Sequence, residues 1–349
     1  MKAAVIRNKP RRIEIENVID PVPGEGEYLI QMKAVGLCGS DVHGFLDENS
    51  IGRVDGLIMG HEPAGVVVSC GPGAEKFKPG DRVVIDPQFS CGKCYACKHA
   101  WYNICEEGGI IGSNLRGFRQ GAMAEYVALK ERHLHVLPDS MSFEEGALME
   151  PVSNSIHAVN RAGVKIGDKV AVIGAGTIGL CMIQAARAAG AQTVIAVDVS
   201  EFHLELAKQL GADYVVNSRE LDPIEAVRSL CGGIGSDVTI ESAGFGETYR
   251  QACLMTRKRG TLVFFGAASD EVKSFHLYPI LHRELNCVGC TGFDVELDMG
   301  IAMVNSGKIN VKPLITHRFS FTQTGEAIRT VVEKPNEVLK VVLVNDVTP

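Results

Sequence analysis

Residues 170–198 decide the fold of this chain; they read VAVIGAGTIGLCMIQAARAAGAQTVIAVD. An apolar run leads into Gly174, Gly176 and Gly179, which have the spacing G-x-G-x-x-G. A helical pattern follows, and then a second apolar run that ends in Asp198. Glycines at this spacing permit a tight turn, the close approach of a pyrophosphate group and close packing of the helix on the strand. The stretch therefore predicts a dinucleotide-binding βαβ unit with the phosphates at the helix N-terminus.

Asp198 indicates which dinucleotide binds. Its carboxylate can accept hydrogen bonds from both ribose hydroxyls and would repel a 2′-phosphate, so we expect NAD rather than NADP. Thr177 and Ile178, at the start of the predicted helix, are expected to contact the cofactor as well. An alternative is that Asp198 is simply an acid at the start of the next helix, although Ser200 could cap that helix instead.

Strands and helices alternate around this motif, from about residue 152 to about residue 290. That alternation predicts a parallel, doubly wound sheet. The predicted strands are Lys169–Ile173, Thr193–Val197, Tyr214–Val216, Asp237–Glu241 and Thr261–Phe265, and the predicted helices are Val152–Ala162, Ile178–Ala189 and Glu201–Gln209.

The chain before residue 150 has a different pattern. Short β-type runs alternate with turns such as Gly71-Pro72-Gly73 and Pro79-Gly80, which predicts a β-rich domain. After residue 290 the pattern is mixed again. The predicted strands of the first part are Glu27–Val35, Ala64–Ser69 and Asp81–Ile85, and the end of the chain adds a helix at Val295–Val304 and a strand at Leu339–Val344.

Composition and charge exclude several classes of function. The chain has 349 residues, enough for two domains, and its 46% of hydrophobic residues is ordinary for a globular protein. The net charge of −7 offers no basic face, so we expect neither nucleic acid nor membrane as a partner. The first residues lack the apolar segment of a signal peptide, which favours the cytoplasm. Thiols stay reduced there, so eleven cysteines do not indicate disulfides.

Four of those cysteines stand within residues 91–105, CGKCYACKHAWYNIC. A ferredoxin-like cluster shares the opening C-x-x-C-x-x-C, but its usual last step is three residues with a proline after the cysteine. Here the last step is seven residues and no proline follows. A redox pair would need only two thiols. Four thiolates on a short loop are typical of a closed, structural zinc site, and the predicted ligands are Cys91, Cys94, Cys97 and Cys105.

Other metal-ligand residue types are dispersed along the chain. Cys38 lies in CGSDVH, His61 and Glu62 lie in MGHEPAG, and Glu150 lies in LMEPVSN. Taken singly, each has an ordinary explanation, such as a buried cysteine or a structural histidine. Together, one thiolate, one imidazole and one or two carboxylates suit a zinc ion with an open coordination position.

The order of these motifs closely resembles the zinc-containing medium-chain dehydrogenases, and most of all their polyol (sorbitol-type) branch. The resemblance begins at Cys38, passes through the four-cysteine loop and the glycine motif, and continues to VNSGKINVKPLITHRF at 304–319. It implies an α/β protein with a GroES-like, β-rich catalytic domain and a doubly wound Rossmann domain. The implied limits are residues 1–152 for the catalytic domain with both zinc sites, 153–290 for the NAD-binding domain, and 291–349 for the return to the catalytic domain.

Residue by residue, the resemblance makes Cys38, His61 and Glu62 neighbours of the catalytic zinc. Glu150 stands where alcohol dehydrogenases carry a second cysteine ligand, and a glutamate there can hold the zinc-bound water instead. Whether Glu62 or Glu150 is the direct ligand stays open at this point. Ser40 and His43 match the proton-relay positions, and the four-cysteine loop matches the structural zinc site of the family.

Two positions depart from the branch. An Arg-Tyr pair that grips the substrate hydroxyls aligns with Gly292 and Phe293 here, so the substrate pocket should differ from a sorbitol pocket. A basic residue usually follows the ribose-binding aspartate by five positions, and here that residue is His203, which we still expect beside the cofactor.

The expected activity is hydride transfer from a secondary alcohol of a small polyol, sugar or sugar derivative to NAD, which gives the ketone. Zinc would act as a Lewis acid on the substrate hydroxyl, and the proton would leave through Ser40 toward His43. One alternative is a threonine-type 3-hydroxy amino acid dehydrogenase, favoured by Asn154 and by EFHLELAK at 201–208. Others are a non-catalytic NAD-binding protein and an oxidoreductase without catalytic zinc. We expect a homotetramer or homodimer.

Overall fold

The computed structural model describes residues 1–349 except 9–10, 48–49, 268–276 and 346–349. The chain forms two compact units. The first comprises Met1–Glu150, Leu297–Asn305 and Leu314–Pro349, and the second comprises Pro151–Glu296 and Ser306–Pro313. Residues 306–313, which we expected with the catalytic domain, pack within the second unit, where Gln184 Oε1 accepts a hydrogen bond of 2.7 Å from the Asn310 amide.

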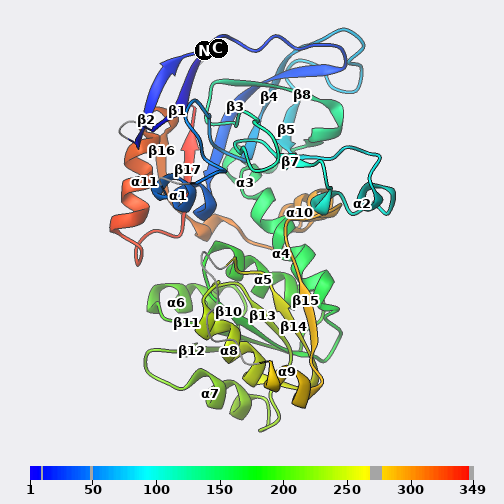
Figure 1. The fold of residues 1–349 in the computed structure, drawn as a ribbon, viewed down its shortest axis with the longest axis vertical. Helices are drawn as coiled ribbons and strands as arrows, with labels where there is room; N and C mark the ends of the chain where they lie inside the picture. Colours follow the sequence, from blue (N-terminus) through cyan, green and yellow to red (C-terminus); the bar gives the residue numbers. More distant parts are fainter. Residues whose placement is uncertain (9–10, 48–49, 268–276, 346–349) are drawn as a thin grey trace. The chain divides into compact units, whose positions relative to one another are not determined.

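The second unit is built on a six-stranded sheet in which every neighbouring pair is parallel (Figure 1). Its order is β12-β11-β10-β13-β14-β15, which is 3-2-1-4-5-6 when the strands are counted from β10. This is the order of the doubly wound dinucleotide-binding sheet, and it confirms the predicted fold class. The strands are β10 Lys169–Ile173, β11 Thr193–Asp198, β12 Tyr214–Asn217, β13 Ser236–Glu241, β14 Thr256–Phe264 and β15 Asn286–Gly289.

Helices cover the strands of this sheet, as the sequence pattern predicts. Val227 of α7 and Ala252 of α8 share one apolar cluster with Ala171 and Ile173 of β10, which places both helices on one face. The helices are α4 Met149–Ala162, α5 Thr177–Ala188, α6 Glu201–Gln209, α7 Pro223–Leu230, α8 Gly246–Met255 and α9 Tyr278–Arg283.

The element boundaries agree with the predictions where apolar residues mark them. Strand β10 and helix α6 match at both ends, and Ser200 caps α6 by accepting from the His203 amide. Strand β14 starts at Thr256, five residues before the predicted start at Thr261. The prediction relied on an apolar run, whereas residues 256–260 read TRKRG and are polar.

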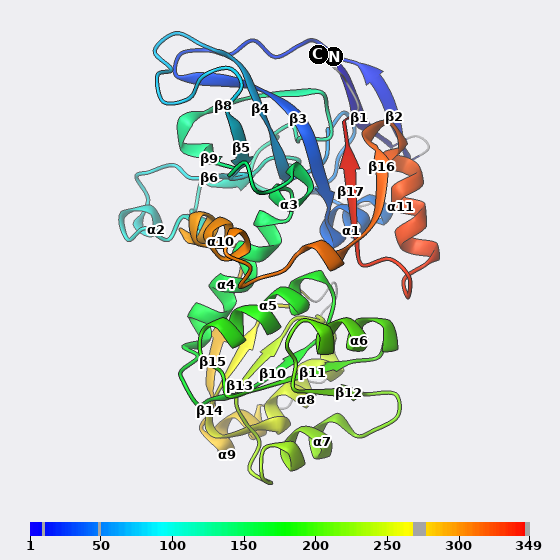
Figure 2. The ribbon, with the colours of Figure 1, turned by 180° about the vertical axis from the view of Figure 1, so that it is seen from behind.

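The first unit contains a seven-stranded sheet with the path β16-β17-β3-β4-β5-β9, and β8 pairs with β3 (Figure 2). Of the last two strands of the chain, β17 pairs with β3 and β16 lies on the far side of β17. The other described strands of this unit form a hairpin of β1 and β2 and a short pair of β6 and β7. The strands of the unit are β1 Lys2–Asn8, β2 Arg11–Asn17, β3 Glu27–Leu37, β4 Glu62–Cys70, β5 Arg82–Ile85, β6 Gln88–Phe89, β7 Gly109–Ile110, β8 Tyr126–Lys130, β9 Leu134–Val136, β16 Ile315–Ser320 and β17 Lys340–Val344.

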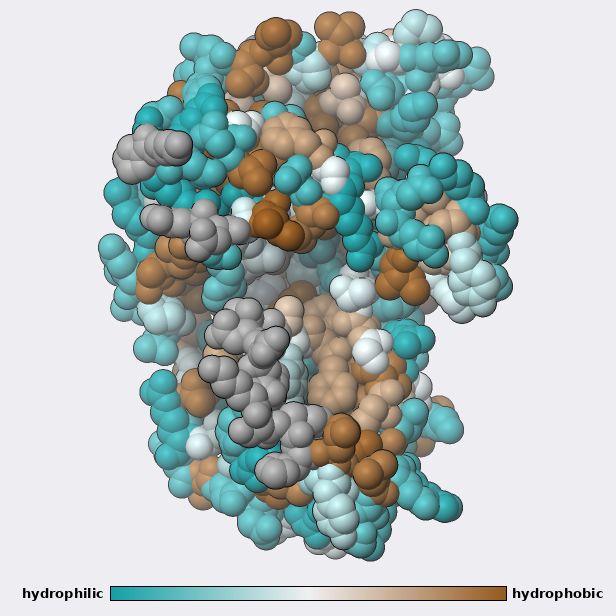
Figure 3. Space-filling model, viewed as in Figure 1, coloured by the Kyte–Doolittle hydropathy of each residue, from teal (hydrophilic) through white to brown (hydrophobic). Residues whose placement is uncertain are grey.

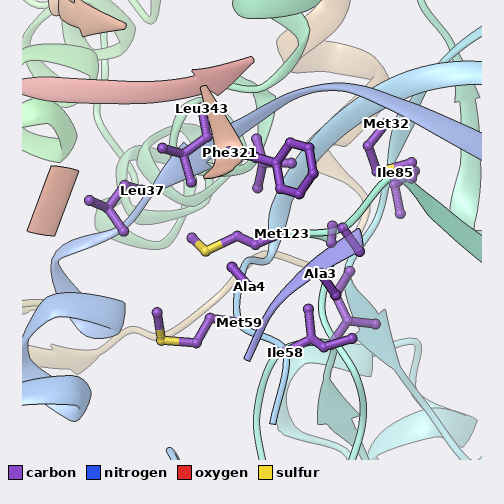
Figure 4. Close-up of a cluster of buried hydrophobic side chains, with 14 of the residues drawn as sticks. Ala3, Ala4, Met32, Leu37, Ile58, Met59, Ile85, Met123, Phe321 and Leu343 are labelled. Carbon is purple, nitrogen blue, oxygen red and sulfur yellow. The ribbon is translucent and has the colours of Figure 1, made fainter. Parts of the chain in front are cut away.

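A buried apolar cluster holds the site-bearing segments of the first unit (Figure 4). Leu37, the last residue of β3, Met59, which stands two residues before His61, and Leu343 of β17 are each at most 5% exposed. Because close-packed cores resist displacement, the residues that follow Leu37 and Met59 start from fixed points. The remaining helices of this region are α1 Gly39–Leu46, α2 Tyr95–Lys98, α3 Phe143–Gly146, α10 Glu296–Asn305 and α11 Thr324–Glu333.

The surface is mixed in character. On the face drawn in Figure 3, hydrophilic side chains predominate and hydrophobic ones form separate small groups. Within the described residues, no helix combines the length and the apolar character needed to cross a membrane.

Candidate active site

The four-cysteine loop brings its sulfur atoms together. All four Sγ atoms lie within 4.8 Å of one another, with Cys91 and Cys97 3.9 Å apart and Cys94 and Cys105 3.8 Å apart. Zn–S bonds of about 2.3 Å place the sulfur atoms of a tetrahedral site about 3.8 Å apart. No disulfide joins cysteines of the described residues. The geometry therefore fits a closed zinc site, in which four thiolates leave no position for water.

Backbone amides of this loop donate hydrogen bonds to the cysteine sulfur atoms and so favour their thiolate form. The Cys94 amide donates to Cys91 Sγ at 3.3 Å, and the Cys91 amide donates to Cys105 Sγ at 3.2 Å. Amides of Cys97 and Glu106 lower the pKa of the Cys94 thiol. Amide dipoles aimed at sulfur stabilise its anionic form, which is the form that binds a metal.

A second cluster forms where β3 and β4 lie side by side. Cys38 directly follows β3 and occupies the N-cap position of α1, His61 precedes β4, and Glu62 begins β4 opposite Gly36 of β3. One ligand atom from each of Cys38, His61 and Glu62 lies within 4.8 Å of the other two. Antiparallel pairing of the two strands thus joins residues that are more than twenty positions apart in the sequence.

His61 has a buried partner behind it. Its Nδ1 lies 3.5 Å from Asp41 Oδ2, and Arg53 Nη2 donates to the same carboxylate at 2.7 Å. Burial lowers the pKa of His61, but the Asp41 carboxylate and the Cys38 thiolate outweigh it and raise that pKa well above its ordinary value. The negative charges that favour a proton on His61 also favour a metal cation beside it. Cys38, His61 and Glu62 therefore fit a zinc ion.

Asp41 is itself held as an anion. It is fully buried, and burial raises its pKa, but His61 and Arg53 together bring the pKa below the usual range of aspartate. A carboxylate behind a metal-binding histidine fixes the orientation of its ring and the nitrogen that carries the proton. Asp41 lies at ion-pair distance from His61 without a hydrogen bond to its Nδ1, and Arg53 fixes the position of that carboxylate.

Glu150 does not belong to the three-residue cluster, although it lies close to it. Among the described residues, the set whose ligand atoms approach one another within 4.8 Å contains Glu62 and not Glu150. Glu150, at the start of α4, is near enough to Lys340 to contribute to raising the pKa of that lysine. Geometry therefore favours Glu62 over Glu150 as the direct ligand, which the sequence had left open.

A pocket of about 340 Å³ opens beside this cluster. Ser40 and His61 both line it, so a molecule in the pocket would lie against the candidate metal position. His43 is exposed and stands three residues after Ser40 on α1, which puts both side chains on one face of the helix. The other lining residues are Gly44, Asp47, Ser50, Ile51, Gly52, Arg53, Ile110, Ser113 and Leu115.

In the second unit, the three glycines of the motif have three distinct environments. Gly174 has φ +90°, a backbone conformation that favours glycine. A Cβ on Gly179 would lie 1.8 Å from the Gly174 carbonyl oxygen, so only glycine permits that helix packing. A Cβ on Gly176, the N-cap of α5, would meet nothing within 4 Å. Open space at that helix N-terminus is what an approaching pyrophosphate needs.

Asp198 ends β11 beside the glycine turn. Its Oδ2 accepts a hydrogen bond of 2.6 Å from the Ala175 amide, and its Oδ1 accepts from the Ser200 amide at 2.9 Å. Burial raises the pKa of Asp198, but His203 and these amides lower it below its ordinary value, so the group is an anion. His203 Nδ1 lies 3.6 Å from Asp198 Oδ1. Ser200 is the N-cap of α6, the possibility left open by the sequence, so Asp198 is not needed as the cap of that helix.

The structure qualifies the expectation for Gly292 and Phe293. Gly292 has φ +61°, and Phe293 is only 1% exposed. A side chain at 292 would be strained whatever its chemistry, and Phe293 is a fully buried ring. Grafting an Arg-Tyr pair at these positions would therefore test backbone strain as much as substrate preference.

Around the Cys38–His61–Glu62 cluster, sequence reasoning missed the buried charged residues Asp41, Arg53 and Lys340. Signals for two of them were present. Asp41 stands inside the quoted motif CGSDVH, and Lys340 begins KVVLV, an otherwise apolar strand. A lysine in such a strand rarely stays buried without an anionic partner. Arg53 carried no signal, because its partner Asp41 lies twelve residues away on another element.

Comparison with known proteins shows the family to which this chain belongs. Residues 24–139 match the alcohol dehydrogenase GroES-like domain, and residues 177–305 match the zinc-binding dehydrogenase domain. Sorbitol dehydrogenase of Bacillus subtilis (strain 168) is 35% identical over 98% of this chain and 97% of its own length. L-idonate 5-dehydrogenase of Vitis vinifera is 36% identical over 90% of this chain and 86% of its own length.

Solved structures agree with the fold. A protein of Sinorhizobium meliloti 1021, solved with NADP bound, is 30% identical and superposes with a TM-score of 0.89 over 99% of both chains. This chain therefore belongs to the zinc-containing medium-chain dehydrogenases and, within them, to the polyol branch. It is an oxidoreductase that acts on CH–OH groups and uses zinc and a nicotinamide dinucleotide.

Proposed function

We propose that this chain oxidises a secondary alcohol of a small polyol, sugar or sugar derivative to the ketone, with NAD as the hydride acceptor. The observation that carries the proposal is the Cys38–His61–Glu62 cluster, which lies beside a pocket of about 340 Å³. Ser40, Ser50 and Ser113 line that pocket with hydroxyl groups, which suit a substrate with several hydroxyls of its own.

The relatives support this substrate class over the alternatives. One acts on sorbitol and another on L-idonate, that is, on a polyol and a sugar acid, which share a secondary alcohol on a hydroxylated chain. A threonine-type dehydrogenase is not favoured by these relatives, in spite of Asn154. A non-catalytic protein is disfavoured by the three-residue metal cluster.

The residues of this chain divide the work of the reaction. Cys38, His61 and Glu62 would hold the catalytic zinc, and Cys91, Cys94, Cys97 and Cys105 the structural one. When bound, zinc supplies Lewis acidity at the substrate hydroxyl, and NAD accepts the hydride. Asp41 keeps His61 oriented, and the glycine turn at 174–179 holds the pyrophosphate at the N-terminus of α5.

Ser40 and His43 move the proton outward. Ser40 Oγ accepts the hydroxyl proton of the substrate within the pocket and donates its own toward solvent. His43, exposed on the same face of α1, receives that proton on a ring nitrogen and passes it to solvent. Glu150, close to the cluster, holds water or a neighbouring hydroxyl of the substrate.

A substrate panel tests the proposal. The purified chain would be offered sorbitol, other polyols, sugar acids, threonine and simple alcohols, while the formation of NADH is followed. We expect vicinal diols of sugars and polyols to be oxidised with the highest kcat/KM. Highest efficiency with threonine would favour the alternative dehydrogenase, and no oxidation of any alcohol would overturn the proposal.

The preference for NAD rests on Asp198, because its carboxylate would repel a 2′-phosphate. Asp198→Ala should therefore raise kcat/KM with NADP relative to NAD by about tenfold or more, an effect of ~1.4 kcal/mol. Glu201→Ala, which removes an exposed acid of α6 three residues away, is the matched control and should leave the ratio unchanged. Equal efficiency of the unaltered chain with both cofactors would contradict the preference.

Three broader expectations belong to the same proposal. Residues 1–152 and 291–349, apart from 306–313, act as the catalytic domain, and residues 153–290, with which 306–313 pack, act as the NAD-binding domain. The protein works in the cytoplasm as a homotetramer or homodimer. Light scattering on the eluted protein measures the assembly, and a monomeric mass would contradict that part.

A further inference from the structure

A buried lysine stands against the candidate zinc ligands, and the relay and cofactor sites do not use it. Lys340, the first residue of β17, is 4% exposed. Its Nζ donates to Glu62 Oε1 at 2.7 Å and lies 2.5 Å from Glu62 Oε2. The same ammonium group donates to the Leu37 carbonyl at 3.3 Å. Glu62 is itself 1% exposed, so this is an ion pair removed from water.

Strand β3, which lies between β17 and β4, leaves room for this pair. Gly36 of β3 lies opposite Glu62 in the register, and β17 pairs with the same segment of β3. A Cβ on Gly36 would lie 1.9 Å from Glu62 Oε2 and 3.1 Å from Glu62 Cβ. Any side chain at position 36 would therefore displace the carboxylate from its place beside Lys340. Strand β17 fixes the Glu62 carboxylate through the charge of Lys340, and strand β3 leaves space for it at Gly36.

The charges of the cluster explain why a cation is needed there. Cys38 as thiolate, Glu62 and Glu150 carry three negative charges, whereas zinc carries two positive ones. The Lys340 ammonium group hydrogen-bonds to Glu62 and to the Leu37 carbonyl, so its positive charge lies directly against the negative charge of the cluster. With Lys340 and a zinc ion the charges of these groups sum to zero, and without Lys340 one negative charge is left over. That charge is costly at Glu62, which is 1% exposed, because a buried charge needs a partner.

We propose that Lys340 is a positioning residue for Glu62. It holds Oε1 by a hydrogen bond and fixes the carboxylate as an ion pair, so that Glu62 offers zinc only Oε2, which has no hydrogen-bond partner, and the open position stays open to substrate. The inference rests on the proposed assignment of Glu62 to the catalytic zinc. A carboxylate freed from Lys340 can bind a metal through both oxygens. That would fill the position that a catalytic zinc site keeps open. The same ion pair draws electron density from Glu62, which keeps the zinc a stronger Lewis acid.

Replacing Lys340 with methionine keeps an unbranched side chain, one atom shorter, and removes the charged group. For Lys340→Met we expect kcat to fall about 10–100-fold, the range typical of groups that orient a metal ligand, while KM for NAD stays unchanged. The zinc content should stay at the unaltered value, because Glu62 remains available. Lys340→Arg restores a cation beside the carboxylate and should recover part of kcat.

Cobalt substitution supplies a readout that does not depend on turnover. With Co²⁺ at the catalytic site, the visible absorption weakens when a further ligand oxygen binds, since its intensity reports coordination geometry. We expect weaker bands for Lys340→Met and also for Gly36→Ala, which displaces Glu62 without changing the charge. The matched controls are Lys33→Met, a half-buried lysine of β3, and Gly289→Ala, a strand glycine whose added Cβ meets nothing within 4 Å.

The outcomes separate this inference from the proposed function. Unaltered bands and kcat in folded Lys340→Met and Gly36→Ala would overturn the role of Lys340. If the unaltered chain oxidises no polyol, the proposed function fails, but the cobalt spectra still report on Lys340. Should Lys340→Met fail to fold, Gly36→Ala and Lys340→Arg carry the same test.

Discussion

The four-cysteine loop and the Cys38–His61–Glu62 cluster are both candidate zinc sites of the first unit, but they are built in opposite ways. The loop supplies all its ligands from fifteen consecutive residues, and backbone amides of the same loop support their sulfur atoms. The cluster draws on residues 38, 61 and 62, and its supports come from positions 41, 53 and 340. A site closed within one loop can stabilise that loop, whereas a site assembled from several strands can leave one side open to substrate.

Cys38→Ser should have the largest effect on activity. Serine is a poor zinc ligand, so kcat/KM should fall by more than about a hundredfold, beyond the range seen when only a supporting group is lost. The thermal midpoint should hardly change, because β3 and the apolar cluster stay intact. Initial rates and a melting curve measure the two effects. Cys70→Ser, which alters another half-buried cysteine of the first unit, is the control and should keep full activity.

Cys94→Ser should act the other way round, on stability more than on turnover. Loss of one of four thiolates opens the closed site, and a loss of ~2 kcal/mol would lower the melting temperature by about 4–8 °C in a unit of this size. Cys287→Ser, an exposed cysteine of β15, should melt with the unaltered chain. An unchanged midpoint for Cys94→Ser would show that the loop does not depend on its metal.

Arg53→Met tests the support behind the open site. It leaves the buried Asp41 carboxylate without its arginine partner and loosens the orientation of His61. Activity should fall about 10–100-fold, less than in Cys38→Ser, with the structural zinc retained. Arg12→Met, which alters an arginine of β2, is the control. If activity stays within about twofold of the unaltered chain, the Asp41–Arg53 pair is structural and does not serve His61.

The same contrast explains what the sequence could predict. The sequence alone predicts a motif whose residues lie close together in the chain, because the spacing indicates the function. Examples are the cysteine pair Cys91 and Cys94 and the glycine turn before α5. The dispersed candidate ligands Cys38, His61 and Glu62 were predicted through resemblance, since no local pattern joins them. Lys340 was missed because it is separated from Glu62 by almost the whole chain, and only the pairing of β17 with β3 brings them together.

Metal analysis of the purified protein tests the central claim most directly. The account predicts two zinc ions per chain in the unaltered protein and one in Cys38→Ser, with the remaining ion retained by the four-cysteine loop. Iron in place of zinc, or the same zinc content in Cys38→Ser as in the unaltered chain, would contradict a catalytic zinc at Cys38, His61 and Glu62.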